Sequence, residues 1–215
     1  MSEPAAPVDV EFFLDPICPW CWLTSRWVTN VQAERPYVVG WRFISLFVLN
    51  EDKEPSEEMR QAHLAGLRCL RVLDQVRADL GNDAVAALYT ELGNRIHVDR
   101  RRDELVADPV TFVAEALTAA GFDPQLATHA LDESHDRALR DEVAVALSRT
   151  GPDVGTPILT FAPGRGDREG SFFGPVVSKA PRGADAVKLW DAVETLATSG
   201  VAEIKRSLRA RPDFS

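Results

Sequence analysis

The hydrophobic pattern of this 215-residue chain changes period twice, and this change constrains the fold more than any other feature. Residues 8–15 and 37–49 are rich in β-branched and aromatic residues, and a helical segment separates them. From residue 55 to about residue 150 only helical patterns occur. Strand signals return in "TPILTFA" and "SFFGPVVS", and the last long pattern, "GADAVKLWDAVETLAT", is helical again.

This order predicts an α/β protein made of a β-α-β unit, a helical block and a β-β-α unit. Without the block, the two units form one small sheet flanked by helices, with the last two strands joined through the turn "PGRGDREG". We therefore predict a discontinuous domain of residues 8–50 and 151–215 and an inserted all-helical domain of residues 51–150. A further short helix is expected through Val201, Ile204 and Leu208.

The segment "DPICPWCW" places two cysteines at the junction between the first strand and the first helix. Pro19 suits the first helical position, so Cys18 lies at the helix N-terminus, where unpaired N–H groups stabilise a thiolate. Cys-X-X-Cys pairs in this setting have pKa values of about 3.5 to 7. Cys21 follows one turn later on the same face and can close a disulfide, while Trp20 offers an aromatic surface beside the sulfur. The pattern favours a thiol–disulfide active site.

Two other interpretations of the pair remain open. A zinc half-site needs two further ligands, but the remaining cysteine and the histidines form no paired ligand motif, so no metal is predicted. We expect Cys69 to be a small buried apolar residue and His63, His129 and His135 to be surface or capping residues. Alternatively, both cysteines of the pair are merely structural, an interpretation that the strand–turn–helix context disfavours.

A second motif, "GTPIL", opens the strand that follows the helical block. If the bond between Thr156 and Pro157 is cis, the backbone before it turns toward the sulfur pair and offers an N–H and a C=O to a substrate. The alternative is an ordinary trans proline at the start of an edge strand. The cysteine pair earlier in the chain favours the cis form.

The charge balance and the composition of the first residues disfavour several classes of protein. The chain has 24 Lys and Arg against 33 Asp and Glu, a net charge of −9, which disfavours a nucleic-acid or anionic-membrane surface. The start "MSEPAAPVDVEFF" has neither a basic region nor a long apolar region, and no run approaches 18 apolar residues. Three cysteines are too few for a disulfide scaffold. We expect a cytoplasmic protein.

Five segments together resemble the actinobacterial mycothiol-dependent nitroreductases of the DsbA-like branch of the thioredoxin superfamily. They are "DPICPWCWLTSRW", "SLFVLNED", "LYTELGNRIH", "DVGTPIL" and "FFGPVVSKAPRGADAVKLWDA". The resemblance extends from about residue 8 to residue 192 and implies a thioredoxin fold with an inserted helical domain. It also implies a cytoplasmic enzyme, often a homodimer, that reduces nitro-aromatic or disulfide substrates and is recharged by the low-molecular-weight thiol mycothiol.

Carried onto this chain, the resemblance implies that Cys18 is the nucleophile, Cys21 the resolving thiol and Pro157 the cis-proline opposite them. Trp20, Asn50 and His97 lie within matched motifs and are expected in the substrate pocket. The glycine-rich "GRGDREG" and Met59 depart from the family pattern and leave the substrate range open.

Other functions remain open at this stage. One is a protein disulfide oxidoreductase or isomerase acting on polypeptides. Another is a thiol-transferase or isomerase on the same scaffold, although such enzymes typically carry serine at the position of Cys18. A third is a non-catalytic module with a zinc-loaded cysteine pair.

Overall fold

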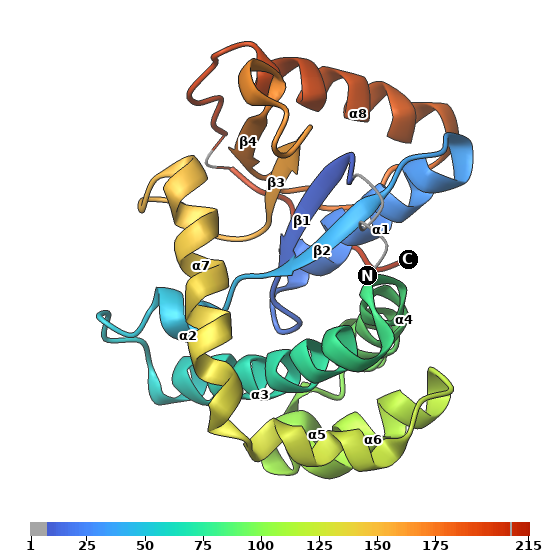
Figure 1. Ribbon diagram of the computed structural model, residues 1–215, viewed down its shortest axis with the longest axis vertical. Helices are drawn as coiled ribbons and strands as arrows, with labels where there is room; N and C mark the ends of the chain where they lie inside the picture. The colour runs from blue at the N-terminus through green and yellow to red at the C-terminus, as the bar shows by residue number, and fades with distance from the viewer. Residues whose placement is uncertain (1–7, 207) are drawn as a thin grey trace, which may run out of the picture.

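The computed structural model describes residues 8–206 and 208–215 and centres on one four-stranded sheet (Figure 1). The strand order is β2-β1-β3-β4. Strands β1 (Val10–Leu14) and β2 (Val39–Phe43) are parallel, whereas β3 (Ile158–Phe161) and β4 (Gly170–Phe173) complete the sheet by antiparallel pairing. This is the predicted order of a β-α-β unit followed by a β-β-α unit, with the helical segment between β2 and β3.

Strand β1 is apolar along most of its length because helices cover both faces of the sheet. Phe12 and Leu14 belong to the main hydrophobic core, which also contains Trp27 of α1 (Pro19–Glu34) and Trp190 of α8 (Gly183–Thr198). Helices α1 and α8 thus cover one face. The alternation of side chains along a strand sends Phe13 to the other face.

That second face is covered by α7 (Asp136–Thr150), the last helix before β3 (Figure 1). Val143 and Ala146 of α7 form a smaller apolar cluster with Phe13, Ile44 and Ile158. The sheet is therefore enclosed between α1 and α8 on one side and α7 on the other.

The helical block packs beside the sheet and shares its core. Residues of the longest helix, α3, belong to the same hydrophobic cluster as the strands, among them Leu70 and Leu73. The division of the chain into domains therefore stays a prediction. Besides α7, the chain between β2 and β3 forms α2 (Leu46–Leu49), α3 (Glu57–Leu80), α4 (Asn82–Gly93), the π-helix η1 (Asn94–Val98), α5 (Arg102–Ala107), α6 (Pro109–Ala119), and the 3₁₀ helices η2 (Pro124–Leu131) and η3 (Glu133–His135).

Two predicted elements differ from the structure. The strand expected over residues 37–49 ends at Phe43, because Ser45 caps the short helix α2 by accepting a hydrogen bond from the Val48 amide. The short helix expected through Val201, Ile204 and Leu208 is wrong: residues 200–206 and 208–215 form no helix. These three side chains are 36%, 65% and 86% exposed, so no apolar face is buried to stabilise a helix there.

Within the described part of the chain, no helix combines the length and the apolar character needed to cross a membrane.

Candidate active site

Cys18 is the residue on which the site is built, and the start of α1 positions it. The turn after β1 closes through a hydrogen bond from the Cys18 amide to the Asp15 carbonyl, 3.1 Å long. Cys18 then caps α1, with its sulfur accepting from the Cys21 amide at 3.5 Å and Pro19 at the first helical position. The Cys18 sulfur thus lies at a helix N-terminus, where the unpaired amides and the helix dipole favour a negative charge.

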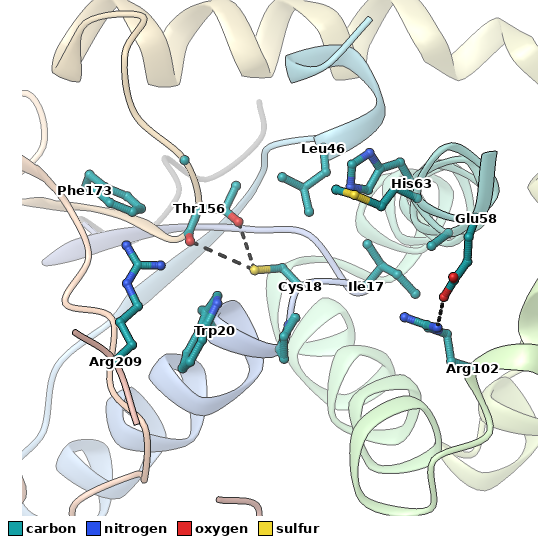
Figure 2. Close-up of a pocket in the computed structure, with 14 residues that line it drawn as sticks. Ile17, Cys18, Trp20, Leu46, Glu58, His63, Arg102, Thr156, Phe173 and Arg209 are labelled. Carbon is teal, nitrogen blue, oxygen red and sulfur yellow. Dashed lines mark hydrogen bonds and ion pairs between the residues drawn. The ribbon is translucent and has the colours of Figure 1, made fainter. Parts of the chain in front are cut away.

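Thr156 reaches the same sulfur from the other end of the chain. Its hydroxyl donates to the Cys18 Sγ at 3.0 Å, and its carbonyl oxygen lies 4.0 Å from that sulfur, as Figure 2 shows. The peptide bond between Thr156 and Pro157 is cis, and both residues are buried. The structure therefore brings the two motifs together across 138 positions of sequence.

These contacts move the pKa values of the two cysteines in opposite directions. Hydrogen bonding with the Cys21 side chain, with the Thr156 hydroxyl and with the Cys21 amide lowers the pKa of Cys18, although burial and the nearby Asp15 oppose this. Burial, together with the neighbouring Cys18, raises the pKa of Cys21 well above its usual value. The lowered pKa favours the thiolate form of Cys18, and the raised pKa favours the thiol form of Cys21. Both thiols are free.

Cys18 opens onto a cavity of about 370 Å³ although only 4% of the residue is exposed. Trp20 and Phe173 supply aromatic surface to this cavity, and the lining is otherwise largely apolar. Its polar edge carries an ion pair between Glu58 and Arg102, 2.9 Å long (Figure 2). The other lining residues are Ile17, Pro19, Leu46, Met59, Ala62, His63, Gly155, Thr156 and Arg209.

The C-terminal segment after α8 supplies Arg209 to this cavity. The Arg209 guanidinium lies 5.9 Å from the centroid of the Trp20 ring, on the side of the cavity opposite Arg102 (Figure 2). Further along, the Asp213 amide donates to the Ser178 carbonyl at 2.7 Å, which ties the segment to the chain before α8. An ion pair between Lys179 and Asp213, 2.9 Å long, supports the same attachment.

His97, predicted in the pocket, lies behind the cysteine loop and does not line the cavity. Its Nε2 is 2.9 Å from the Pro16 carbonyl oxygen, and its ring stacks against Trp22 and Phe214. Burial lowers the pKa of His97 to about 4, so the ring is neutral near pH 7 and Nε2–H donates to Pro16. His97 thus supports the loop that carries Cys18.

Asn50, also predicted in the pocket, ends α2 and is likewise absent from the cavity lining. Its amide nitrogen donates to the Leu46 carbonyl at 2.8 Å, and its oxygen accepts from Lys53 at 3.1 Å. These contacts use both ends of the side-chain amide to close the turn after α2.

Asp15 is a residue of the site that the sequence reasoning missed. Its carboxylate is fully buried and accepts from the amides of Ile17 at 3.0 Å and Leu46 at 2.7 Å. Burial raises the pKa of Asp15 to about 7, although both amides oppose the rise. The available signal is an acidic residue that directly follows the largely apolar strand β1.

Three comparisons with known proteins show what this chain is similar to. Residues 17–206 match the family described as Rv2466c-like, mycothiol-dependent nitroreductase Rv2466c. The uncharacterized protein Rv2286c of Mycobacterium tuberculosis (strain ATCC 25618 / H37Rv) is 31% identical over 199 residues, covering 87% of this chain and 76% of that protein. Among solved structures, the probable DsbA oxidoreductase SCO1869 from Streptomyces coelicolor superposes with a TM-score of 0.55 at 16% identity, covering 92% of both chains.

The solved structure confirms the predicted fold class, a DsbA-like thioredoxin fold with a helical insertion. Fold and family together indicate a thiol-dependent oxidoreductase. The family match spans residues 17–206, which include the cysteine pair, the helical block and Thr156. This chain belongs to the family of Rv2466c-like mycothiol-dependent nitroreductases.

Proposed function

We propose that this protein is a mycothiol-dependent reductase in which Cys18 is the nucleophile and Cys21 the resolving thiol. The observation that carries the proposal is the environment of the Cys18 sulfur. This sulfur lies at the N-terminus of α1 and beside a cavity, and it accepts a hydrogen bond from the Thr156 hydroxyl at 3.0 Å. A thiolate is the reactive form of cysteine, and this environment lowers the pKa of Cys18 while burial keeps Cys21 protonated.

With a disulfide substrate, the Cys18 thiolate attacks one sulfur, the substrate S–S bond breaks, and the departing thiolate takes a proton. Cys21 then loses its proton and attacks the Cys18 sulfur, which releases the second substrate thiol and leaves a Cys18–Cys21 disulfide. Two electrons have passed from the cysteine pair to the substrate. With a nitro-aromatic acceptor, the same two electrons and two protons convert the nitro group to a nitroso group and water.

Two mycothiol molecules reduce the Cys18–Cys21 disulfide back to the dithiol: the first opens it and forms a mixed disulfide with Cys18, and the second attacks the mycothiol sulfur of that mixed disulfide. The products are oxidised mycothiol and the two cysteine thiols, which take up the protons of the two mycothiol molecules. The cavity suits a small thiol that carries polar groups, because apolar walls adjoin Cys18 while Glu58, Arg102 and Arg209 provide charged partners at the edge. Cys18 is only 4% exposed, which favours a small-molecule partner over a folded polypeptide. The cytoplasmic location and the homodimer stay predictions from the sequence.

Asp15 has the properties of a proton acceptor during resolution. Its buried carboxyl has a pKa of about 7, so it can hold or release a proton near neutral pH. The charge on Asp15 also acts on the pKa of Cys18, which places it within electrostatic reach of the cysteine pair.

Mass spectrometry of a Cys21→Ser variant tests the proposed function. After exposure to oxidised mycothiol, we expect one mycothiol adduct on Cys18, because the resolving thiol that would remove it is gone. A Cys18→Ser variant should gain no adduct. A Cys69→Ser variant should react with oxidised mycothiol as the unsubstituted protein does, because Cys69 is fully buried. An unmodified Cys18 in the Cys21→Ser protein contradicts mycothiol as the co-substrate.

A further inference from the structure

A second cluster of metal-ligating side chains lies outside the cavity, in the two 3₁₀ helices η2 and η3. His129 and His135 present ring nitrogens to each other, Nδ1 to Nε2, at 3.1 Å. Asp132 places Oδ2 3.8 Å from the same His129 nitrogen, and one donor atom from each of the three residues lies within 4.8 Å of the others. None of the three lines the cavity beside Cys18.

A fourth residue, from a different helix, orients this cluster. Asp74 of α3 lies with Oδ2 2.9 Å from Nδ1 of His135. When Nδ1–H donates to this carboxylate, the lone pair of Nε2 points toward His129. A carboxylate that holds the far nitrogen of a ligating histidine is the usual outer contact of protein metal sites. Asp74 is itself fixed by Arg77, at 2.8 Å.

The spacing of the two nitrogens matches a tetrahedral metal site. Ligands about 2.0–2.1 Å from a zinc ion in tetrahedral geometry lie ~3.3 Å apart. The observed 3.1 Å between the two ring nitrogens is close to this edge length, and Asp132 at 3.8 Å needs only a small movement. Imidazole nitrogens select Zn²⁺ and its neighbours among divalent metals rather than Mg²⁺ or Ca²⁺.

We propose that His129, Asp132 and His135 bind one divalent transition-metal ion of the Zn²⁺ class, with water completing the coordination. Because Nε2 of His135 accepts, Nδ1 of His129 carries the proton between the two rings in the metal-free protein, and metal binding at Nδ1 requires His129 to carry its proton on Nε2 instead. The site would join η2 and η3 to α3 through Asp74, so we expect it to stabilise the helical block.

The neighbouring charges are compatible with a bound cation. Arg71 is paired with Asp136 at 2.7 Å, and its NH2 group lies 4.0 Å from Glu133. Arg77 is paired with Asp74 and also with Glu142, at 3.1 Å. Each of these two arginines is therefore engaged by carboxylates, which limits the repulsion a metal ion would meet.

The experiment uses the untagged full chain with Cys18→Ser and Cys21→Ser, which removes the thiols that would compete for metal. Zn²⁺ is titrated by calorimetry, bound metal is counted after gel filtration, and Co²⁺ is used for its absorption spectrum. We expect one equivalent of Zn²⁺, an intense tetrahedral Co²⁺ spectrum and a higher Tm with Zn²⁺. In the same background His129→Ala should lose all three signals.

His63→Ala is the matched control and should keep one equivalent, because His63 lies in the other cavity. Asp74→Asn should weaken Zn²⁺ binding about 10- to 100-fold without abolishing it. If His129→Ala fails to fold, His129→Gln decides, since the His129 side chain is 29% exposed. Absence of Zn²⁺ binding, or equal binding in His129→Gln and the parent, overturns the proposal.

Discussion

At the scale of single residues, the sulfur of Cys18, the proposed nucleophile, accepts a hydrogen bond from a hydroxyl that is remote in sequence. Thr156 donates to the sulfur from the loop before β3, and the Cys21 amide donates from the first turn of α1. A hydrogen bond to a charged group stabilises it by about 1.5–3 kcal/mol, and one pKa unit corresponds to about 1.4 kcal/mol. Loss of a single donor should therefore be measurable.

We predict that Thr156→Val raises the pKa of Cys18, because the thiolate loses a donor while the thiol loses little. The rate of iodoacetamide alkylation, measured across pH in Cys21→Ser and Cys69→Ser protein, should therefore shift to higher pH. Thr156→Ser keeps the hydroxyl and should retain the parent profile. Superimposed profiles for the valine and parent proteins would show that the hydroxyl does not stabilise the thiolate.

At the scale of elements, α1 is positioned by close contact with the end of α4. Trp22 of α1 packs against Tyr89, with ring centroids 5.9 Å apart, and lies directly over Gly93. A Cβ at position 93 would lie 2.1 Å from the Trp22 ring, and a rigid indole that is 3% exposed cannot move aside easily. Gly93 thus allows the approach of α4 to the helix that carries Cys18.

We predict that Gly93→Ala destabilises the protein although alanine favours helices. The gain in helix propensity is about 1 kcal/mol, whereas overpacking a core typically costs about 1–3 kcal/mol and more when backbone must shift. Urea denaturation should show a lower midpoint. Ala87→Ser, an exposed change in the same helix, serves as the control and should leave the midpoint nearly unchanged. A higher midpoint for Gly93→Ala would mean that Trp22 repacks freely.

The order of elements could be predicted because hydrophobic period and turn residues are local properties. The strand β1, the helix α1 with Pro19 at its start, and the hairpin of β3 and β4 all follow from residues close in sequence. Boundaries were less predictable: Ser45 ends the extended segment early by capping α2, a competition that apolar periodicity does not reveal.

Within the site, the cysteine pair could be predicted, but contacts between distant segments could not. His129 and His135 looked like separate surface or capping residues, and Asp74, 61 positions before His135, joins them only in three dimensions. Asn50 was expected in the pocket from its motif, yet its side chain closes a local turn instead. The position of Arg209 could not be predicted, because the apolar spacing beside it indicated a short helix and gave no sign of a contact with the cavity.

At the scale of the whole molecule, the buried carboxyl of Asp15 makes the free energy of unfolding depend on pH. Asp15 has a folded pKa of about 7 against 3.8 for the free side chain. When the folded pKa of an acid is raised, its contribution to stability is fully present below the unfolded pKa. That contribution is lost as pH rises from about 4 to about 7, because the unfolded chain has released a proton that the folded protein still holds.

We predict that Asp15→Asn removes this loss of stability with rising pH. The free energy of unfolding of the variant relative to the parent should increase with pH between about 4 and 7, by on the order of 1.4 kcal/mol per unit, and then level off. Urea denaturation at several pH values measures the difference. Asp99→Asn, at an exposed position, is the control. A difference that does not vary with pH would show that Asp15 is already ionised in acid.

The end of the chain has a consequence for how related enzymes diverge. Residues 208–215 form neither helix nor strand, yet Arg209 borders the cavity and Phe214 rests on His97. Substitutions and length changes in such a segment leave the sheet and its covering helices intact, so evolution can retune which molecules enter without rebuilding the chemistry. For the same reason, assays of a protein with a purification tag fused after Ser215 should be compared with the untagged protein, because the tag would extend from the segment that carries Arg209 and Phe214.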